Sequence, residues 1–374
     1  MPMLNDLPKE GIVARLSHTG GPFELDSVGL PELRAGEALL KVEACTICAS
    51  DLRTFRGERA APASGLLGHE IVGRIVALGL DAGPTDIDGE SVAIGDRFIC
   101  GVAASCGDCR YCERGIPQKC VSLQKFGHAA ANDRWQLSGG FAEFCHLPVG
   151  AVLARIPNSI AARQAAWLGC AGATAAAALR TAGDVEGRVV LVIGSGAVGL
   201  FVAAMAAAAG AHVLAIDRRE DRLALARSVG VTARHLVTAE QTADQRLETS
   251  EAFVREHSVG SGADVVFETS GANESVVAAL SLADTGGRII LAGSVAPSNP
   301  VPLRPEKVVT SLLRIEGVHN YTPRDLASAV SFASAHAILL NHLTADFPSI
   351  RLAEINSAFD SALSGKKLRV AVEP

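Results

Sequence analysis

The sequence predicts an α/β fold in which a doubly wound parallel sheet accompanies a second, mainly β, barrel-like domain. First, a strand, a glycine turn, a helix, a second strand and an acid follow one another between residues 184 and 217. Second, strand and helix patterns alternate after this unit, whereas short alternating runs broken by Gly and Pro precede it. Third, a chain of 374 residues is long enough for two domains.

The glycine turn is the centre of the predicted parallel sheet. Val189–Ile193 is a short apolar run rich in β-branched residues, typical of a strand buried on both faces. The sequence GSGAVG follows at 194–199, and an Ala-rich run to Ala209 then predicts a helix. His212–Ile216 predicts the next strand, which delivers Asp217.

Each part of this unit suits a dinucleotide. Gly194 allows the tight turn, Gly196 lets a pyrophosphate approach the backbone, and Gly199 lets the helix lie close to the strand. Val198 belongs to the same turn, whose free N–H groups attract phosphate, and Asp217 can accept both ribose hydroxyls of an adenosine. A purely structural glycine turn is the alternative, but the strand, helix and acid stand where nucleotide binding needs them.

Composition excludes some classes of protein. The chain is 48% hydrophobic and 20% charged with a net charge of −6, which indicates a globular protein without a basic surface for nucleic acid. The first residues show no signal peptide, so we expect a cytoplasmic protein. Residues 189–211 are apolar, but glycines interrupt them, which argues against a membrane span.

The N-terminal part indicates a β-rich domain. Residues 11–45 alternate apolar and polar in short runs, and Ala38–Val42 is the clearest strand. Residues 81–97 predict a hairpin. His69 and Glu70 follow a glycine and precede an apolar run, so we expect them at the start of a strand, on the barrel rim.

The cysteines indicate metal binding. There are nine, an odd number, and clustered cysteines in a long chain without a signal peptide favour a metal over disulfides. Four of them fall within fifteen residues and can surround one ion as a closed tetrahedral set: Cys106, Cys109, Cys112 and Cys120. The alternative is a group of buried thiols, which the charged residues between them oppose. A closed set leaves no position for substrate, so we expect a structural zinc.

The other cysteines are ambiguous by themselves. Cys45 and Cys48 form a C-x-x-C pair that suits redox chemistry or zinc. Cys170 precedes an Ala-rich helix and could be a buried apolar thiol.

Further elements complete the prediction. Strands are expected at Ala263–Glu268, Arg288–Ala292 and Lys367–Val372. Helices are expected at 219–229, 273–284, Asp325–Ala337 and Leu352–Leu363.

Taken together, these motifs resemble the zinc-dependent medium-chain alcohol dehydrogenases over nearly the whole chain. The resemblance rests on Cys48-x-Ser50-Asp51, Gly68-His69-Glu70, the Cys106–Cys120 group, Gly169-Cys170 with Thr174, and the nucleotide unit. More narrowly, residues 115–120, 137–143 and 317–321 resemble the branch called phosphonate catabolism-associated alcohol dehydrogenases.

The resemblance implies a catalytic zinc held by Cys48, His69 and Cys170. Two thiolates and one imidazole would leave a fourth tetrahedral position for water or alcohol. Asp51 would hydrogen-bond to His69 and fix its tautomer. Glu70 would touch the zinc transiently or only organise the rim.

The resemblance also implies residues for proton transfer and cofactor binding. Ser50 would take the alcohol proton, Thr174 would pack against the nicotinamide, and Gly293 would line its pocket. Arg222 and Arg369 match positions that contact the ribose and the pyrophosphate; ordinary surface charges are the alternative.

The implied architecture has two domains. A GroES-like, barrel-like catalytic domain would comprise residues 1–171 and 317–374, with the structural zinc lobe at 100–120. A Rossmann domain would comprise residues 172–316, and the reaction would occur in the cleft between the two. The family also suggests a homodimer or a homotetramer.

One position departs from the family pattern. Many relatives carry a proton-relaying histidine two residues after the Asp of Cys-x-Ser-Asp, where this chain has Arg53. Arginine stays protonated and cannot act as a base. Arg53 could instead bind an anionic substrate, with Arg56 and Arg59 nearby, or contact the cofactor's phosphates, or face solvent.

We therefore expect an enzyme that oxidises an alcohol, or reduces an aldehyde or ketone, with two zinc ions per chain and NAD preferred over NADP. A polyol or threonine dehydrogenase is the nearest alternative, although these often use a glutamate ligand where Cys170 stands. A zinc-free quinone reductase would not need Cys48, His69 and Cys170 together. A zinc module that binds nucleic acid would need a basic surface. An inactive relative that only binds ligands would be favoured only if one of the zinc-ligating residues were missing.

Overall fold

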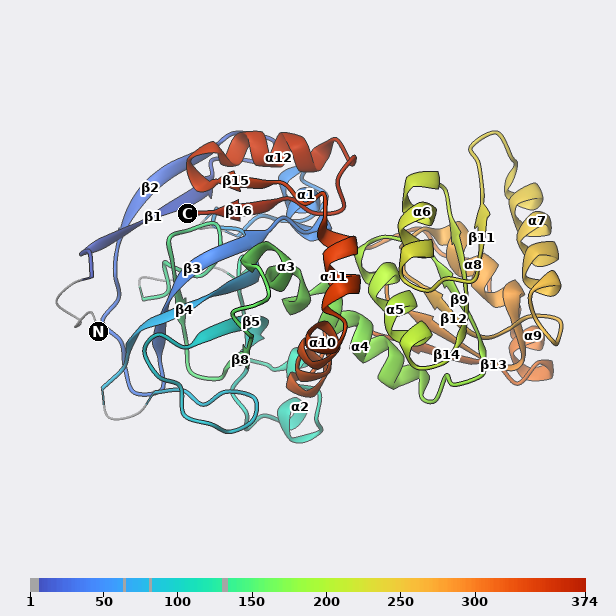
Figure 1. Ribbon diagram of the computed structural model, residues 1–374, viewed down its shortest axis with the longest axis horizontal. Helices are drawn as coiled ribbons and strands as arrows, with labels where there is room; N and C mark the ends of the chain where they lie inside the picture. The colour runs from blue at the N-terminus through green and yellow to red at the C-terminus, as the bar shows by residue number, and fades with distance from the viewer. Residues whose placement is uncertain (1–6, 63–64, 81–82, 130–133) are drawn as a thin grey trace. The chain divides into compact units, whose positions relative to one another are not determined.

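The computed structural model describes residues 7–62, 65–80, 83–129 and 134–374. It divides into two compact units, one formed by Met1–Cys170 with Thr322–Pro374 and the other by Ala171–Tyr321 (Figure 1). The sequence places these junctions after residues 171 and 316, and the structure places them after 170 and 321.

The second unit contains a six-stranded parallel sheet in the order β11-β10-β9-β12-β13-β14. Its strands are β9 (Val189–Ile193), β10 (His212–Asp217), β11 (Ala233–Leu236), β12 (Ala263–Glu268), β13 (Ala283–Leu291) and β14 (Arg314–Gly317). Its helices are α4 (Ala171–Ala182), α5 (Ala197–Ala208), α6 (Glu220–Ser228), α7 (Ala243–Glu256), α8 (Asn273–Leu282) and α9 (Pro305–Thr310). Helices α4, α5 and α6 cover one face and α7, α8 and α9 the other (Figure 1). This is the predicted doubly wound sheet.

The register of the strands determines which residues lie at the edge of the sheet where a ligand can bind. All five residues of β9 are buried, because α-helices cover both faces of the sheet. Ile193 pairs with Ile216 of β10 and with Glu268 of β12, so the carboxyl ends of three neighbouring strands meet at one edge. In such sheets ligands bind at that edge, where the strand order reverses.

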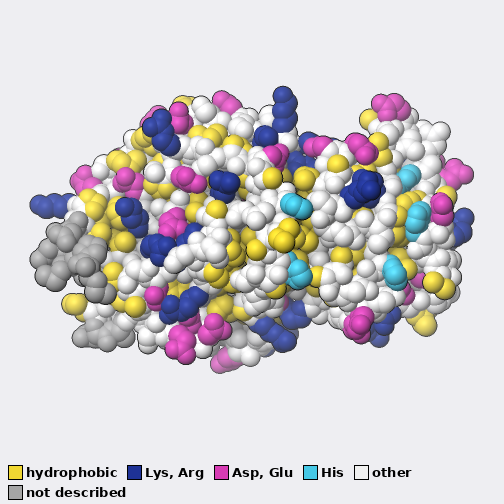
Figure 2. Space-filling model, in the orientation of Figure 1, with side chains coloured by type: hydrophobic (Ala, Val, Ile, Leu, Met, Phe, Trp, Pro, Cys, Tyr) yellow, Lys and Arg dark blue, Asp and Glu magenta, His cyan; other side chains and the backbone are white. Residues whose placement is uncertain are grey.

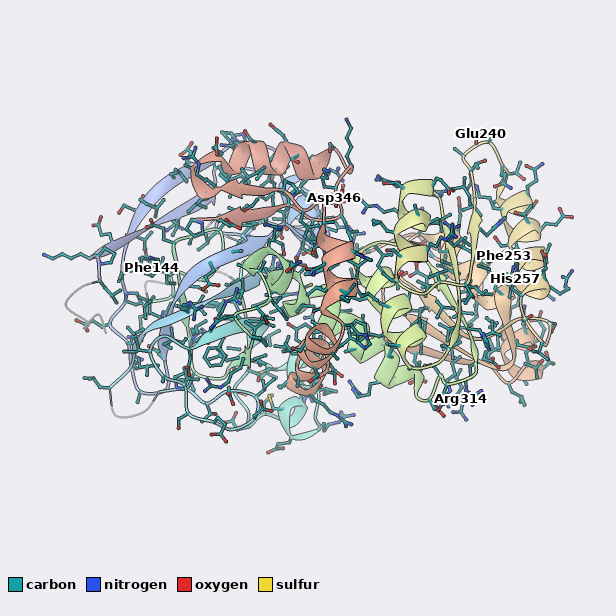
Figure 3. All side chains as sticks on the ribbon, viewed as in Figure 1. Phe144, Glu240, Phe253, His257, Arg314 and Asp346 are labelled. Carbon is teal, nitrogen blue, oxygen red and sulfur yellow. The ribbon has the colours of Figure 1, made fainter. Side chains whose placement is uncertain are left out.

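The core of this unit is apolar and continuous. Side chains from β9, β10, β12 and β13 pack with those of α7 and α8. On α7, Phe253 also stacks on His235, with the ring centroids 5.2 Å apart, and His257 lies next to it (Figure 3). The unit therefore has a hydrophobic core of its own.

The first unit is mainly β. Its main sheet runs β15-β16-β3-β4-β5-β6, β7 pairs with β3 and β8 with β5, and β1 and β2 form a separate antiparallel pair. The strands are β1 (Glu10–Leu16), β2 (Phe23–Gly29), β3 (Ala38–Thr46), β4 (Glu70–Leu78), β5 (Arg97–Ala104), β6 (Gln124–Lys125), β7 (Phe144–Leu147), β8 (Ala151–Arg155), β15 (Ser349–Arg351) and β16 (Ala371–Glu373). The helices are α1 (Ala49–Phe55), α2 (Arg110–Glu113), α3 (Ala162–Ala166), α10 (Pro323–Ala335), α11 (Ala337–Thr344) and α12 (Ile355–Leu363). The described residues also form short 3₁₀ turns at η2 (Pro117–Lys119), η3 (Trp167–Gly169) and η4 (Leu352–Glu354).

Among the described residues, two apolar clusters stabilise the first unit. The larger joins β3, β4 and β5 to the C-terminal helix α12, where Phe23, Phe141 and Phe359 pack ring against ring. The smaller contains Phe144 of β7, labelled in Figure 3. The last fifty residues therefore complete the core that the first 170 begin.

Several predicted elements differ from the structure in extent. The predicted strand at 367–372 forms only as β16, and α11 was not predicted. Strand β13 begins at Ala283, where the prediction still has helix. Within the predicted hairpin at 81–97, residues 81–82 lie outside the described residues, and Thr85 bridges Ser91 in antiparallel fashion.

Membrane and charge features are simple. Within the described ranges no single helix is long and apolar enough to cross a bilayer; α10 and α11 pass that test only together, and they bend by 94° at their junction. On the face drawn in Figure 2, basic and acidic side chains are intermixed.

Candidate active site

The first unit brings together three of the predicted zinc ligands and a carboxylate. The ligand atoms of Cys48, His69, Glu70 and Cys170 all lie within 4.8 Å of one another. Cys48, His69 and Glu70 are buried, and Cys170 is half-buried. Two thiols and an imidazole in one buried pocket are the donor set of a three-ligand catalytic zinc site, so the residues present fit this metal.

Local sequence explains how these side chains meet. Cys48 is the N-cap residue of α1, and His69 stands directly before β4. Gly68 has φ +92°, and a Cβ there would lie 2.8 Å from the Cys45 sulfur and 2.9 Å from the Phe141 nitrogen. Only glycine fits this position, which turns the chain so that His69 reaches Cys48.

Asp51 performs two tasks with its two oxygens. Oδ2 accepts a hydrogen bond from the Cys48 backbone N–H at 2.9 Å and so caps α1. Oδ1 lies 3.4 Å from Nδ1 of His69. This carboxylate is fully buried, and it leaves Nε2 of His69 as the nitrogen available to a metal. Ser50 Oγ lies 3.5 Å from that same Nε2.

Glu70 and Arg369 form a buried ion pair beside the thiols. The Arg369 guanidinium donates to both carboxylate oxygens of Glu70, at 3.0 and 3.1 Å, and its Nη2 lies 3.7 Å from the Cys48 sulfur. Thr46 also donates to Glu70. The prediction assigned Arg369 to the pyrophosphate and omitted these contacts.

The electrostatics suit a metal-binding thiolate. A hydrogen bond from Cys170, together with nearby Arg369 and His69, holds the pKa of Cys48 well below its usual range although burial opposes this. Burial raises the pKa of Glu70 to about 7, against the effect of Arg369. A thiolate at Cys48 is therefore compatible with this buried position.

The four-cysteine lobe is also assembled. The sulfurs of Cys106 and Cys120 lie 3.3 Å apart, and those of Cys109 and Cys112 lie 3.6 Å apart. Zinc–sulfur bonds of about 2.3 Å imply tetrahedral edges of about 3.8 Å, close to these separations. The nine cysteines are all free, as expected of a metal-binding rather than a disulfide-bonded chain.

The second unit supplies a nucleotide-binding geometry. Gly194 has φ +98°; a Cβ on Gly199 would lie 1.9 Å from the Gly194 oxygen, whereas a Cβ on Gly196 would meet nothing within 4 Å. Glycine is therefore needed for backbone conformation at the first position and for packing at the third. The middle position leaves open space at the N-terminus of α5, where phosphate can approach.

A cavity of about 580 Å³ adjoins this turn. It is lined by residues that include Gly194, Asp217, Arg218, Arg246 and Glu274. The Asp217 carboxylate accepts hydrogen bonds from the backbone N–H groups of Ser195 at 2.6 Å and Arg219 at 2.8 Å, which fixes its position at the end of β10.

The remaining predicted cofactor residues are distributed around this unit. Thr174 is half-buried on α4, and Val198 is half-buried in the first turn of α5. Gly293 packs where a Cβ would meet the Gly271 nitrogen at 2.4 Å. Arg222 is buried on α6, 3.9 Å from Asp221.

His128 and Lys125 were not predicted as residues of this region, whereas Arg59 was named beside Arg53. The ring of His128 lies 4.8 Å from that of His69, and the Arg59 guanidinium lies 3.4 Å from His128 Nε2. Lys125 lies on β6 in the same segment. Their one signal was the presence of a lysine and a histidine between the cysteine lobe and Gly139-Gly140, which is weak without the fold. Arg53 lies on α1, 4.0 Å from Glu58.

Comparisons with known proteins agree with both sites. The family model described as "Alcohol dehydrogenase GroES-like domain" matches residues 34–158, and "Zinc-binding dehydrogenase" matches residues 197–335. An L-threonine 3-dehydrogenase of Coxiella burnetii is 31% identical over 91% of this chain and 92% of its own length. An alcohol dehydrogenase of Geobacillus stearothermophilus is 29% identical over 92% of this chain and 94% of its own.

A solved structure supports the same fold. A zinc-binding dehydrogenase of Sinorhizobium meliloti, bound to NADP, superposes with a TM-score of 0.82 at 26% identity, covering 98% of this chain and 100% of that one. The chain belongs to the zinc-type medium-chain alcohol dehydrogenase family. It is an oxidoreductase that acts on CH–OH groups of small-molecule alcohols, and the predicted fold class is confirmed.

Proposed function

We propose that the chain catalyses the reversible oxidation of a primary or secondary alcohol to an aldehyde or ketone, with NAD as the hydride acceptor. The observation that carries this proposal is the convergence of Cys48, His69 and Cys170 beside the Ser50 hydroxyl. A chain that also holds the glycine turn and Asp217 can bind both the alcohol and the nucleotide.

The proposed catalytic zinc would be held by Cys48, His69 Nε2 and Cys170. When bound there, zinc supplies a Lewis acid that lowers the pKa of an alcohol. Asp51 holds the imidazole in the required tautomer and orientation. Ser50 accepts the alcohol proton, for which its place beside His69 is suitable. Arg369 keeps Glu70 engaged in an ion pair at the rim, which favours the rim role over zinc ligation.

The second proposed zinc is structural. Cys106, Cys109, Cys112 and Cys120 would fill all four tetrahedral positions, so this ion would stabilise the lobe without touching the substrate. We further propose, from the family resemblance, that the protein is a cytoplasmic homodimer or homotetramer.

The proposed preference for NAD rests on Asp217. A carboxylate at the end of β10 accepts hydrogen bonds from a 2′-hydroxyl and repels a 2′-phosphate. The Sinorhizobium meliloti relative is bound to NADP. Arg218 and Arg219, which line the same cavity, could bind a 2′-phosphate if they were released from their acidic partners.

Two alternatives are tested along with the proposal. Because one relative is a threonine dehydrogenase, the substrate panel includes threonine and polyols. A zinc-free quinone reductase would turn over without the three-ligand set, so Cys48→Ser would leave its activity intact.

The experiment follows NADH and NADPH absorbance with a panel of neutral alcohols, polyols, threonine and anionic hydroxyalkyl compounds, alongside zinc analysis of the purified protein. We expect about two zinc ions per chain. Cys48→Ser should abolish turnover while the fold survives, whereas Cys112→Ser should lower stability first. Full activity at one zinc per chain would reject one of the two sites.

A further inference from the structure

The side chains of His128 and Arg59 lie beside the proposed zinc ligands, and Lys125 precedes His128 in the same turn, where its backbone oxygen accepts from the His128 N–H at 3.2 Å. The segment carrying Lys125 and His128 packs directly on the chain before His69, since a Cβ on Gly127 would lie 2.6 Å from the Gly68 backbone. The His128 ring lies 4.8 Å from the His69 ring, centroid to centroid. Arg59 reaches the same place from the end of the α1 segment, 3.4 Å from His128 Nε2. The β6 segment and the α1 segment therefore meet at the metal site.

His128 positions Arg59. A guanidinium has donors only, so Nε2 of His128 must accept the hydrogen bond, and the ring must be neutral with its proton on Nδ1. This contact holds the arginine near the zinc ligands without neutralising its charge. Arg53, the arginine singled out in the sequence, is instead engaged by Glu58.

Lys125 has no acidic partner at ion-pair distance among the described residues, and neither has Arg59. Lys125 is half-buried on β6. Burial and the nearby Arg59 lower the pKa of Lys125, while the Cys170, Cys48 and Asp51 groups oppose that shift because they lie close enough to stabilise the ammonium. A cation without an acidic partner can accept an anion that a ligand carries.

The balance of charges at the site also favours a bound anion. With zinc bound, the thiolates of Cys48 and Cys170 together with Asp51 and Glu70 would carry four negative charges, of which the zinc ion and Arg369 would balance three. One negative charge then remains, whereas Lys125 and Arg59 carry two positive charges. One cation is left over.

We propose that Lys125 and Arg59 bind an oxyanion group carried by the alcohol substrate, with His128 holding Arg59 in place. The substrate class is then a short hydroxyalkyl carboxylate, phosphate or phosphonate, whose hydroxyl lies at the proposed zinc while its anion contacts the two cations. This inference rests on the alcohol-oxidising function proposed above and deepens it. It keeps Arg59, which the sequence already suggested, and replaces Arg53 by Lys125 of the β6 segment.

The test compares matched substrates on four variants. Hydroxyalkyl carboxylates, phosphates and phosphonates of two to four carbons are each paired with the neutral alcohol of equal length. The variants are Lys125→Met, Arg59→Gln and, as a control, Arg351→Gln, an exposed arginine paired with Glu354 elsewhere in the same unit. Lys125→Arg keeps the charge and serves as the rescue. Zinc content and near-UV circular dichroism check that each variant is folded and loaded.

We expect Lys125→Met to lower kcat/KM for the anionic member of a pair by roughly 10- to 100-fold, the range for a lost charged hydrogen bond. The neutral member should change by less than about threefold, and Arg351→Gln should change neither. Lys125→Arg should restore most of the loss. The oxyanion for which kcat/KM falls most, relative to the neutral alcohol of equal length, identifies the anionic group that the substrate carries.

A binding measurement separates this inference from the proposed function. Calorimetric titration of the zinc-loaded enzyme with methylphosphonate, inorganic phosphate and acetate should detect binding that Lys125→Met weakens. If no alcohol is oxidised but this binding is present and Lys125-dependent, the proposed reaction fails and the anion site stands. Equal losses for neutral and anionic alcohols in Lys125→Met would overturn the inference, because the lysine would then serve only the charge of the zinc site. Absence of anion binding to the unaltered enzyme would overturn it as well.

Discussion

At the zinc site, residues that lie far apart in the chain contact each other in pairs. Arg369 and Glu70 are separated by 299 positions, yet they meet in a buried bidentate contact. A buried carboxylate left without its partner is costly, because its desolvation is no longer compensated. Arg369 is therefore a residue on which the stability of the first unit depends, besides any contact it makes with a cofactor.

We predict that Arg369→Gln destabilises the first unit by about 3–5 kcal/mol, the range observed when one partner of a buried ion pair is removed. Urea unfolding followed by tryptophan fluorescence measures this unit alone, since Trp135 and Trp167 both lie in it. The double variant Glu70→Gln/Arg369→Gln should recover part of the loss. If the single variant unfolded at the same urea concentration as the unaltered protein, the ion pair would contribute nothing to stability.

At the scale of elements, the glycine turn between β9 and α5 separates packing from binding. The Cβ of an alanine at 199 would collide with the Gly194 oxygen, whereas one at 196 would enter open space. The same substitution should thus have different consequences three residues apart.

We predict that Gly199→Ala lowers stability by roughly 1–3 kcal/mol, as overpacking does. Gly196→Ala should leave the melting temperature unchanged and weaken NADH binding at least about tenfold, because its methyl group occupies the space for pyrophosphate. Circular dichroism and NADH fluorescence titration measure the two effects separately. Unchanged NADH affinity in Gly196→Ala would place the pyrophosphate elsewhere.

A second element-scale feature is the acid at the start of α8. Glu274 Oε2 lies 3.2 Å from Arg218 Nη2 and 2.8 Å from Arg246 Nη1, and all three residues line the cavity beside Asp217. Glu274 therefore occupies two arginines that a 2′-phosphate could otherwise use.

We predict that Glu274→Gln improves kcat/KM for NADP⁺ relative to NAD⁺ by roughly three- to tenfold, since exposed ion pairs contribute about 0.2–1 kcal/mol each. The double variant Asp217→Ala/Glu274→Gln should shift the ratio further. Calorimetry with 2′-phosphorylated adenosine diphosphate provides a readout without turnover. Glu306→Gln, which breaks an exposed pair with Arg304 outside the cavity, is the control. An unaltered cofactor ratio in both Glu274 variants would contradict the prediction.

At the scale of the whole molecule, the two units have separate cores and separate ligands. Both candidate metal sites belong to the first unit, and the nucleotide cavity belongs to the second. A ligand stabilises the unit that it binds, because it binds the folded form of that unit and not the unfolded form.

We predict that removing zinc with a strong chelator lowers the urea midpoint seen by tryptophan fluorescence more than the midpoint seen by circular dichroism of the helices. NADH at about 100 times its dissociation constant should act mainly on the second unit, by about 2.7 kcal/mol. Coincident shifts of both signals under both treatments would mean that the units unfold as one.

The sequence by itself determined what is local. Four cysteines within fifteen residues can reach one another through a short loop, and GSGAVG with Asp217 is set by one strand, one turn and one helix. The doubly wound sheet was predictable for the same reason, because each strand–helix unit carries its own hydrophobic period. Zinc, nicotinamide chemistry and the family followed from these motifs.

The tertiary structure decided what depends on distant segments. The pairing of Arg369 with Glu70 requires the C-terminal segment to return beside β3, which β16 does through Val372 opposite Cys45. His128 meets His69 only because β6 pairs with β5 and Gly127 fits against Gly68. No sequence period or spacing predicts a contact between side chains that lie far apart in the chain. Strand register and close backbone packing bring such side chains together only in the folded protein. For that reason the sequence offered an anion site at Arg53, with Arg56 and Arg59 nearby, as one of several roles for that arginine, whereas the proposed site at Lys125 and Arg59 needed the fold.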